Sequence, residues 1–179
     1  MTTLTMRWAT SGDVSAIAAL MAAAIDTLQA GFLTPAQIPA SRAVMGLDTQ
    51  LVDDGTYLVA EIDGAMAGCG GWSRRQTLFG GDHSTAQRDP ALLDPATDAA
   101  RIRAMYTHPA FARRSIGRHV LTACEGAARA AGFATAELMA TLSGEPLYVA
   151  CGYRAIERVA VGQGEAAVPM VRMRRSLTN

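Results

Sequence analysis

The chain has 179 residues, a length typical of one domain, so residues 1–179 are taken as a single unit. Half of its residues are hydrophobic and 18% are charged, a composition that excludes a globally disordered chain. Sixteen positive residues, all arginine, balance sixteen acidic ones. The chain therefore lacks the basic excess of a duplex-binding protein, and no nucleic-acid partner is predicted.

The cysteines and the N-terminus bear on the cellular compartment. Cys69, Cys124 and Cys151 are odd in number and form no CxxC pair, which argues against a disulfide scaffold and a zinc ribbon. The three histidines have no metal-ligand spacing, so no metal site is predicted. No signal-peptide pattern opens the chain, and no uninterrupted apolar run reaches 18 residues. We therefore expect a cytoplasmic protein with reduced thiols and no membrane partner.

The first 45 residues predict a strand followed by two helices. Residues 6–9 form a short strand, after which Thr10 and Asp13 can make a capping box at a helix start. Apolar residues then recur at helical spacing from Val14 to Leu28. A second helix is expected from Pro35 to about Met45.

The next part of the chain predicts a β-hairpin. Residues 57–62 and 65–74 flank Asp63-Gly64, a dipeptide typical of a tight turn with positive φ. Glycines at 68, 70 and 71 in the return strand indicate a bulge or a close backbone approach. Residues 75–99 show little periodicity, and we expect this long loop to be either a mobile lid or a plain insertion.

The C-terminal part alternates strands and helices. Pro169 would place the last strand near a sheet edge or a bulge. The order of these elements predicts an α/β fold with a mixed sheet and helices on its faces. The elements are a strand at 101–107, a helix at 116–131 capped by Gly132, a strand at 135–141, a short helix at 144–151, and strands at 153–161 and 168–173.

The chemistry is concentrated where the strand at 101–107 leads into the next helix. A helix N-terminus carries unsatisfied N–H groups and about half a positive charge, and a phosphate fits there. Arg113, Arg114 and Arg118 add positive charge at this position. The sequence therefore predicts an anion site; the alternative is an ordinary helix start with solvated arginines.

The pattern over residues 101–161 resembles the GNAT-superfamily N-acetyltransferases, and the likeness extends more loosely over the N-terminal elements. The resemblance implies a GNAT-like acyl-CoA N-acyltransferase fold, with a splayed, mostly antiparallel sheet flanked by helices. Members carry a (Gln/Arg)-x-x-Gly-x-(Gly/Ala) loop that binds the pyrophosphate of acetyl-CoA. Ala112 and Ser115 depart from that pattern, whereas Gly117 keeps it. The six matching residues are Ala112, Arg113, Arg114, Ser115, Ile116 and Gly117.

The resemblance also implies roles around the cofactor. The backbone of Met105, Tyr106 and Thr107 would bind the pantetheine arm like an added strand, and Thr141 would line its far side. Tyr148 matches the tyrosine that commonly acts as general acid. A phenol with a pKa of roughly 10 is protonated at neutral pH and can donate to a leaving thiolate. The alternative is a core tyrosine.

The acceptor side is less specific in the sequence. The elements that carry Phe32 and Trp72 border the acceptor site in this fold type, and each of these residues is a candidate substrate contact or, alternatively, a core or rim residue. Arg103 could pair bidentately with a substrate carboxylate, or be an ordinary edge or surface arginine. Glu61 and Glu137 are candidate general bases, with bulk water as the alternative.

The expected function is that of an acetyl-CoA-dependent N-acetyltransferase without a metal. It would move the acetyl group directly to a primary amine of a small molecule or peptide in a ternary complex. One alternative is a catalytically silent acyl-CoA sensor, suggested by the altered loop and the unassigned base. Another is transfer of a longer acyl group. Dimers are common among such proteins, so a homodimer is compatible with the resemblance.

Overall fold

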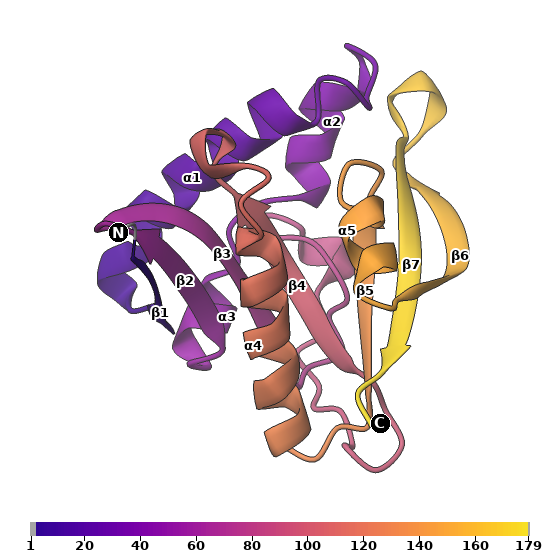
Figure 1. Cartoon of the computed structure of the whole chain (residues 1–179). Coiled ribbons are helices and arrows are strands. Elements are labelled where there is room, and N and C mark those ends of the chain that lie inside the picture. Colours follow the sequence, from indigo (N-terminus) through magenta and orange to yellow (C-terminus); the bar gives the residue numbers. More distant parts are fainter. Residues whose placement is uncertain (1–2, 179) are drawn as a thin grey trace.

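The computed structural model describes residues 3–178, and its seven strands form one sheet in the order β1-β2-β3-β4-β5-β7-β6 (Figure 1). Neighbouring strands are antiparallel except for β4 and β5, which are parallel. The predicted mixed, mostly antiparallel sheet is confirmed. The strands are β1 (Leu4–Trp8), β2 (Tyr57–Ile62), β3 (Ala65–Ser73), β4 (Ala100–Thr107), β5 (Thr135–Thr141), β6 (Arg154–Val161) and β7 (Val168–Ser176).

Helices cover both faces of the sheet because the strand residues alternate in direction. Along β2, Leu58 and Ala60 pack with the helix α4, whereas Tyr57 and Val59 pack with α1 on the opposite face. Figure 1 shows α4 and α5 on one side and α1 and α2 on the other. The helices are α1 (Val14–Leu28), α2 (Gln37–Val44), α3 (Thr49–Asp53), α4 (Ile116–Ala130) and α5 (Glu145–Ala150).

Local signals in the sequence fix several of these boundaries. The Asp13 carboxylate accepts a hydrogen bond from the Thr10 N–H at 2.7 Å, as the capping box predicts, and a second one from the Thr10 hydroxyl at 3.0 Å. Asp63 and Gly64 have φ of 50° and 83°, so the hairpin turn is of the predicted tight kind. Gly132 follows α4 at φ 96°, a left-handed conformation that suits a helix C-terminus.

The expectation from Pro169 is wrong, because β7 is not an edge strand and has no bulge at this residue. It lies between β5 and β6. Pro169 pairs with Ala160 of β6, while the pairing with β5 ends at Met170 and Thr141. The proline therefore sits where β7 extends past β5, and its missing N–H removes no bond from that side of the ladder.

The helix α1 is strongly apolar in composition. By length and composition alone, the stretch Ser11–Leu28 is apolar enough to cross a membrane. Core helices of the same length pass this test as well. In the structure Ile17, Leu20 and Met21 are buried against the sheet, so these apolar side chains form part of the core.

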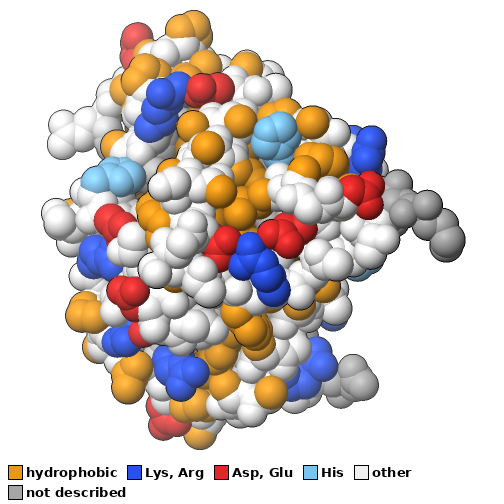
Figure 2. Space-filling view, turned by 90° about the vertical axis from the view of Figure 1, so that its left-hand side faces the viewer, with side chains coloured by type: hydrophobic (Ala, Val, Ile, Leu, Met, Phe, Trp, Pro, Cys, Tyr) orange, Lys and Arg blue, Asp and Glu red, His pale blue; other side chains and the backbone are white. Residues whose placement is uncertain are grey.

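Acidic and basic side chains are mixed on the surface. Figure 2 shows the face on the left of Figure 1, where charges of both signs lie interspersed with apolar side chains. At the β1–β2 edge, Arg7 contacts the carboxylates of both Asp13 and Glu61 at 2.8 Å. Positive and negative side chains therefore neutralise one another at this edge.

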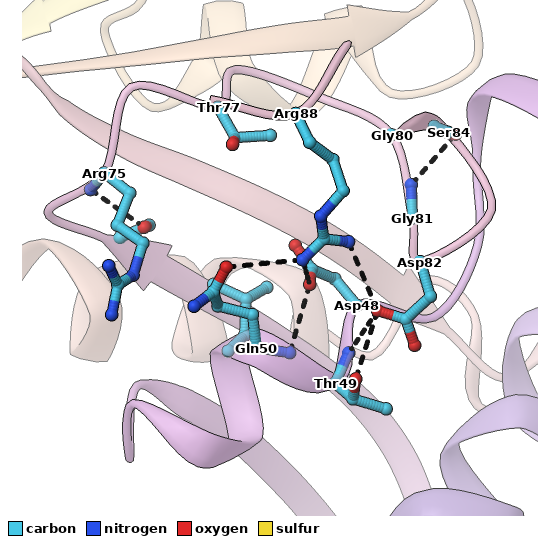
Figure 3. A network of polar contacts seen from close by, with 12 residues as sticks. Asp48, Thr49, Gln50, Arg75, Thr77, Gly80, Gly81, Asp82, Ser84 and Arg88 are labelled. Carbon is cyan, nitrogen blue, oxygen red and sulfur yellow. Dashed lines mark hydrogen bonds and ion pairs between the residues drawn. The ribbon is translucent and has the colours of Figure 1, made fainter. Parts of the chain in front are cut away.

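Residues 75–99 contain one 3-10 turn and are anchored on α3 and on each other. The Thr77 N–H donates to the Asp89 carbonyl at 3.0 Å, which closes the segment into a narrow loop. Arg75 pairs with Asp54 at 2.7 Å, and Arg88 pairs with Asp48 at 3.1 Å. Figure 3 shows Arg88 hydrogen-bonded to Asp48 and Gln50 at the start of α3 and to Asp82 within the segment.

The helix α3 itself is absent from the sequence prediction. It starts at Asp48, whose carboxylate accepts a hydrogen bond from the Gln50 N–H at 3.1 Å. An aspartate cap of this kind is a helix-start signal, but the five residues that follow are too few to show helical periodicity. The second helix also begins later than expected, at Gln37.

The predicted close approach along β3 is confirmed. A Cβ on Gly68 would lie 2.6 Å from Ile116 Cγ2 and 3.2 Å from the Tyr106 carbonyl oxygen, so this glycine lets the start of α4 settle on the sheet.

Gly68→Ala should therefore destabilise the fold by about 1–3 kcal/mol, because Ile116 must move away from the sheet. Thermal unfolding measures the loss. The control is Gly126→Ala within α4, where an added Cβ meets no atom within 4 Å and should stabilise the helix by about 0.5–1 kcal/mol. Equal melting temperatures for the two variants would contradict this packing.

Candidate active site

The sheet opens between β4 and β5. The two strands pair only where Ala100–Ile102 face Ala136–Leu138, and beyond these residues they diverge. The C-terminal half of β4 pairs with β3 alone. Backbone groups of Met105–Thr107 on the side of β5 are therefore available to an extended ligand, which could add to the sheet as a strand does.

A bulge in β4 shapes this opening. Cys69 pairs with Tyr106 and Gly71 with Arg103, so β4 carries one more residue than β3 in this interval. Ala104 takes the strained conformation, with φ of 51°. The buried Tyr57 hydroxyl donates to the Ala104 carbonyl at 2.7 Å and holds the bulge in place.

A cavity of about 760 Å³ occupies the opening. The loop before α4 and the start of α4 form one wall, and α5 contributes Tyr148. The helices α1 and α2 and the stretch Leu78–Gly80 close the side on the opposite face of the sheet. The structure thus joins the predicted phosphate loop, the predicted pantetheine strand and the predicted acid in one cavity.

The start of α4 has the character of an anion site. Ser115 precedes the helix at φ 61° and Arg113 has φ 65°, so the loop adopts the left-handed turns that its glycine-containing pattern needs. A left-handed backbone costs a non-glycine residue about 1–2 kcal/mol, and Ser115, which stands where the family pattern has glycine, carries this cost. The fifteen-residue helix that follows directs its free N–H groups and positive dipole end toward the cavity.

Gly117 keeps α4 close to α5. A Cβ at this position would lie 2.9 Å from Leu147 Cδ2 and 3.6 Å from the Thr107 hydroxyl. Gly117 therefore lets α4 pack closely against Leu147 beside the phosphate loop, and a side chain here would have to push Leu147 aside.

Ten of the eleven predicted cofactor residues line the cavity. Arg114 is the exception: its guanidinium lies over the Phe111 ring, 5.6 Å from the centroid. The residues at the cavity are Met105, Tyr106, Thr107, Ala112, Arg113, Ser115, Ile116, Gly117, Arg118 and Thr141.

Tyr148 lies in the cavity wall with only 8% of its surface exposed. Its ring packs edge-on against Tyr153, with centroids 5.8 Å apart, which fixes its direction. Burial raises the pKa of the Tyr148 phenol above its ordinary value. The group therefore stays protonated at neutral pH and can donate a proton, but cannot serve as a base.

Arg103 is buried and already paired, so it is not the edge or surface arginine of the alternative. Its side chain is 3% exposed and pairs with the fully buried Asp48 at 2.5 Å. It also donates to the Gly80 carbonyl at 2.7 Å. Burial lowers the pKa of the Arg103 guanidinium, and the Asp48 charge opposes that effect. Arg103 borders the cavity with its charge balanced by Asp48, and its Nε–H has no partner among the described residues, so pairing with a substrate carboxylate stays a prediction.

The two predicted aromatic contacts separate in the structure. Phe32 follows α1, is half exposed and lines the cavity. Trp72 is 3% exposed in the core, where it packs edge-on against Phe133 at 6.1 Å, and it does not line the cavity. Trp72 is thus a core residue on the α4 side of β3, which is one of the two alternatives to a substrate contact.

Neither candidate base reaches the cavity. Glu61 pairs with Arg7 at the far edge of the sheet. Glu137 is fully buried among Arg101, Arg172 and Arg174. Burial alone would raise the pKa of Glu137, but its hydrogen bonds with Arg174 and Arg172 hold that pKa below its ordinary value. Both carboxylates have structural partners.

Sequence reasoning missed three parts of the site. Leu78 and Phe79 come from a segment without periodicity, and Asp48 acts through Arg103. Gln29 follows directly after α1 and is a buried residue of the cavity wall, with 6% of its surface exposed. A glutamine that ends an apolar helix has no pattern that would mark it.

Comparison with known proteins places this fold among acetyltransferases. A search of curated proteins finds no match. Among solved structures, the chain is similar to a GCN5-related N-acetyltransferase (aminotransferase, class II) from Rhodopseudomonas palustris, with a TM-score of 0.70, 22% identity and coverage of 98% of this chain and 97% of that one. It is also similar to the PaiA N-acetyltransferase from Thermoplasma acidophilum in complex with coenzyme A (TM-score 0.66, 13% identity, coverage 97% and 99%).

A third similar structure is N-acetylglutamate synthase from Neisseria gonorrhoeae, complexed with coenzyme A and N-acetyl-glutamate. The TM-score is 0.62 at 15% identity, and the match covers all of this chain and 36% of that one. At these identities the likeness concerns the fold. The sequence itself matches the family model described as acetyltransferase (GNAT) family over residues 19–153, well over half of its length. The chain therefore belongs to the acetyltransferase (GNAT) family.

Proposed function

We propose that the protein transfers an acetyl group from acetyl-CoA directly to a primary amine in a ternary complex. The observation that carries the proposal is one cavity of about 760 Å³ that joins the α4 N-terminus, the open edge of β4 and the Tyr148 phenol. Donor and acceptor can approach it from opposite faces of the sheet. The three free cysteines agree with a reducing, cytoplasmic location.

The residues present fit an acetyl-CoA molecule. The start of α4, with Arg113 and Arg118 beside it, would hold the pyrophosphate. Gly117, which has no side chain to obstruct this point, lies beside it. The backbone of Met105–Thr107 would hydrogen-bond the pantetheine arm along the unpaired side of β4. Acetyl-CoA would supply the activated acyl group.

The protein's contribution to the reaction is positioning and one proton. Held in the opening of the sheet, the two reactants lose the freedom that a bimolecular reaction must overcome. As the amine nitrogen bonds to the acetyl carbon and the C–S bond breaks, Tyr148 protonates the departing sulfur. The proton released by the amine passes to water and restores the phenol. The products are the N-acetylated amine and free CoA.

A binding module without turnover is the second candidate. It is favoured by Ala112 and Ser115, which replace the (Gln/Arg) and first Gly of the usual loop, and by the structural pairing of both candidate bases. Such a module would bind acetyl-CoA and leave it intact.

Incubation with acetyl-CoA and a panel of amines separates the two candidates. Mass spectrometry should detect an N-acetylated product that requires both the amine and the protein. Binding of acetyl-CoA without product for any amine would replace the proposed function by the binding module.

A further inference from the structure

The cavity differs in character on the two faces of the sheet. On the α4 face it is lined by the phosphate loop and its arginines. On the α1 and α2 face its wall is apolar and rich in thioethers, with residues that also pack in one hydrophobic cluster. This part is called the acceptor chamber, and it consists of Ala24, Leu28, Gln29, Phe32, Val44, Met45, Leu78, Phe79, Met139 and Met170.

The acceptor chamber offers no negative charge to a bound amine. Among the described residues 3–178, no Asp, Glu or His lines any part of the cavity. Asp48, a buried carboxylate that contacts the cavity-lining Arg103, is held by Arg103 and Arg88. An ammonium ion that entered the chamber would lose its hydration and find no counter-ion there. This desolvation cost favours binding of the neutral amine.

One polar group of the chamber lacks a partner. The Gln29 Nε2 donates weakly to the Thr141 hydroxyl at 3.5 Å, at the end of β5 where the strands diverge. The Gln29 Oε1 is buried and accepts no hydrogen bond from any described residue. A buried acceptor left unpaired is unfavourable, so this oxygen favours a ligand that brings an N–H group.

We infer that the acceptor is an uncharged, apolar amine that binds as its free base and donates an N–H to Gln29 Oε1. This inference rests on the proposed function. Gln29 orients the nitrogen without removing its proton, since a neutral amide is not a base. The thioethers of Met45, Met139 and Met170, together with Phe32, suit an aromatic body. Proton transfer before attack then occurs in water, which explains how the site works without a carboxylate.

Substrate choice gives the first test. The value of kcat/KM for 2-phenylethylamine should exceed the values for phenylalanine and spermidine by about tenfold or more, because these add a carboxylate or further charges to be desolvated. At low pH the value should rise with pH in proportion to the free base. Replacement by 2-fluoro-2-phenylethylamine, whose amine is less basic, should move the profile to lower pH by the difference in amine pKa. A profile that stays in place would overturn the inference.

Variants of Gln29 give the second test. Gln29→Leu should raise KM for 2-phenylethylamine about tenfold and leave acetyl-CoA affinity unchanged. Gln29→Glu should supply a counter-ion and shift preference toward spermidine. The control is Gln163→Leu, at an exposed site outside the cavity, which should change neither value. An unchanged KM in Gln29→Leu, or a wild-type preference for spermidine or phenylalanine, overturns the inference but leaves acetyl transfer intact. Absence of any acetylated amine overturns the proposed function itself.

Discussion

A Tyr148→Phe enzyme should turn over about 10²-fold more slowly than the wild type, with unchanged affinity for acetyl-CoA. The phenol lies in the cavity wall, and burial keeps it protonated. Phenylalanine preserves the edge-on contact with Tyr153 and removes only the proton donor. Steady-state kinetics with saturating amine, together with calorimetric binding of acetyl-CoA, measure the two effects separately.

The matched control for this prediction is Tyr153→Phe. The Tyr153 hydroxyl is buried without a partner among the described residues, and the residue does not line the cavity. Its removal should leave turnover unchanged. If Tyr148→Phe and Tyr153→Phe had equal turnover, Tyr148 would not be the acid.

The pH dependence of turnover in the wild type and in Tyr148→Phe follows from the raised pKa of the Tyr148 phenol. An acid whose pKa is raised loses its proton at higher pH than the free group, so the Tyr148 limb of the rate profile should lie above about pH 10. Turnover should therefore show no loss attributable to Tyr148 between neutral pH and that point. A fall near pH 7 to 8 that disappears in Tyr148→Phe would contradict the direction of the shift.

Asp48→Asn should destabilise the protein by about 3–5 kcal/mol, which corresponds to a fall in melting temperature of roughly 10 °C. The side chain of Arg103 is 3% exposed, and Asp48 neutralises it at 2.5 Å. Asparagine keeps the hydrogen bond that caps α3 but leaves the buried guanidinium without its counter-charge. Thermal unfolding at neutral pH measures the loss.

The control is Asp26→Asn, the same substitution in a pair with Arg42 whose side chains are more than half exposed. Exposed pairs contribute about 0–1 kcal/mol, so this variant should melt close to the wild type. If Asp48→Asn were as mild as Asp26→Asn, the Asp48–Arg103 pair would not anchor the cavity wall.

The elements with strong local signals were predictable from the sequence. The capping box at Thr10, the Asp63-Gly64 turn and the left-handed Gly132 each depend on a few neighbouring residues, and each is present in the structure. Long-range arrangement was not accessible in this way. Pro169 alone suggests an edge strand, and only the relative lengths of β5 and β7 show why an interior strand tolerates it.

The candidate site also has a part that local sequence predicts and a part that depends on long-range arrangement. The residues from Met105 to Arg118 are contiguous, so a strand, a loop and a helix start place them together, and the structure brings ten of the eleven cofactor residues to one cavity. The acceptor chamber joins residues from distant parts of the chain, such as Gln29, Phe79 and Met170. Arg103 illustrates the limit: alternation on a strand gives its face, but its partner Asp48 caps a helix that is too short for periodicity to detect.

The most direct measurement is isothermal titration of acetyl-CoA into the wild type and into Gly117→Glu. The glutamate would displace Leu147 and bring a negative charge to the start of α4. Gly126→Glu adds the same charge to the same helix, nine residues further on, where no neighbour lies within 4 Å. The account predicts binding at one site in the wild type and in Gly126→Glu, and about 10²-fold weaker binding in Gly117→Glu. Equal affinity in the two glutamate variants, or no binding by the wild type, would contradict an acetyl-CoA site at this loop.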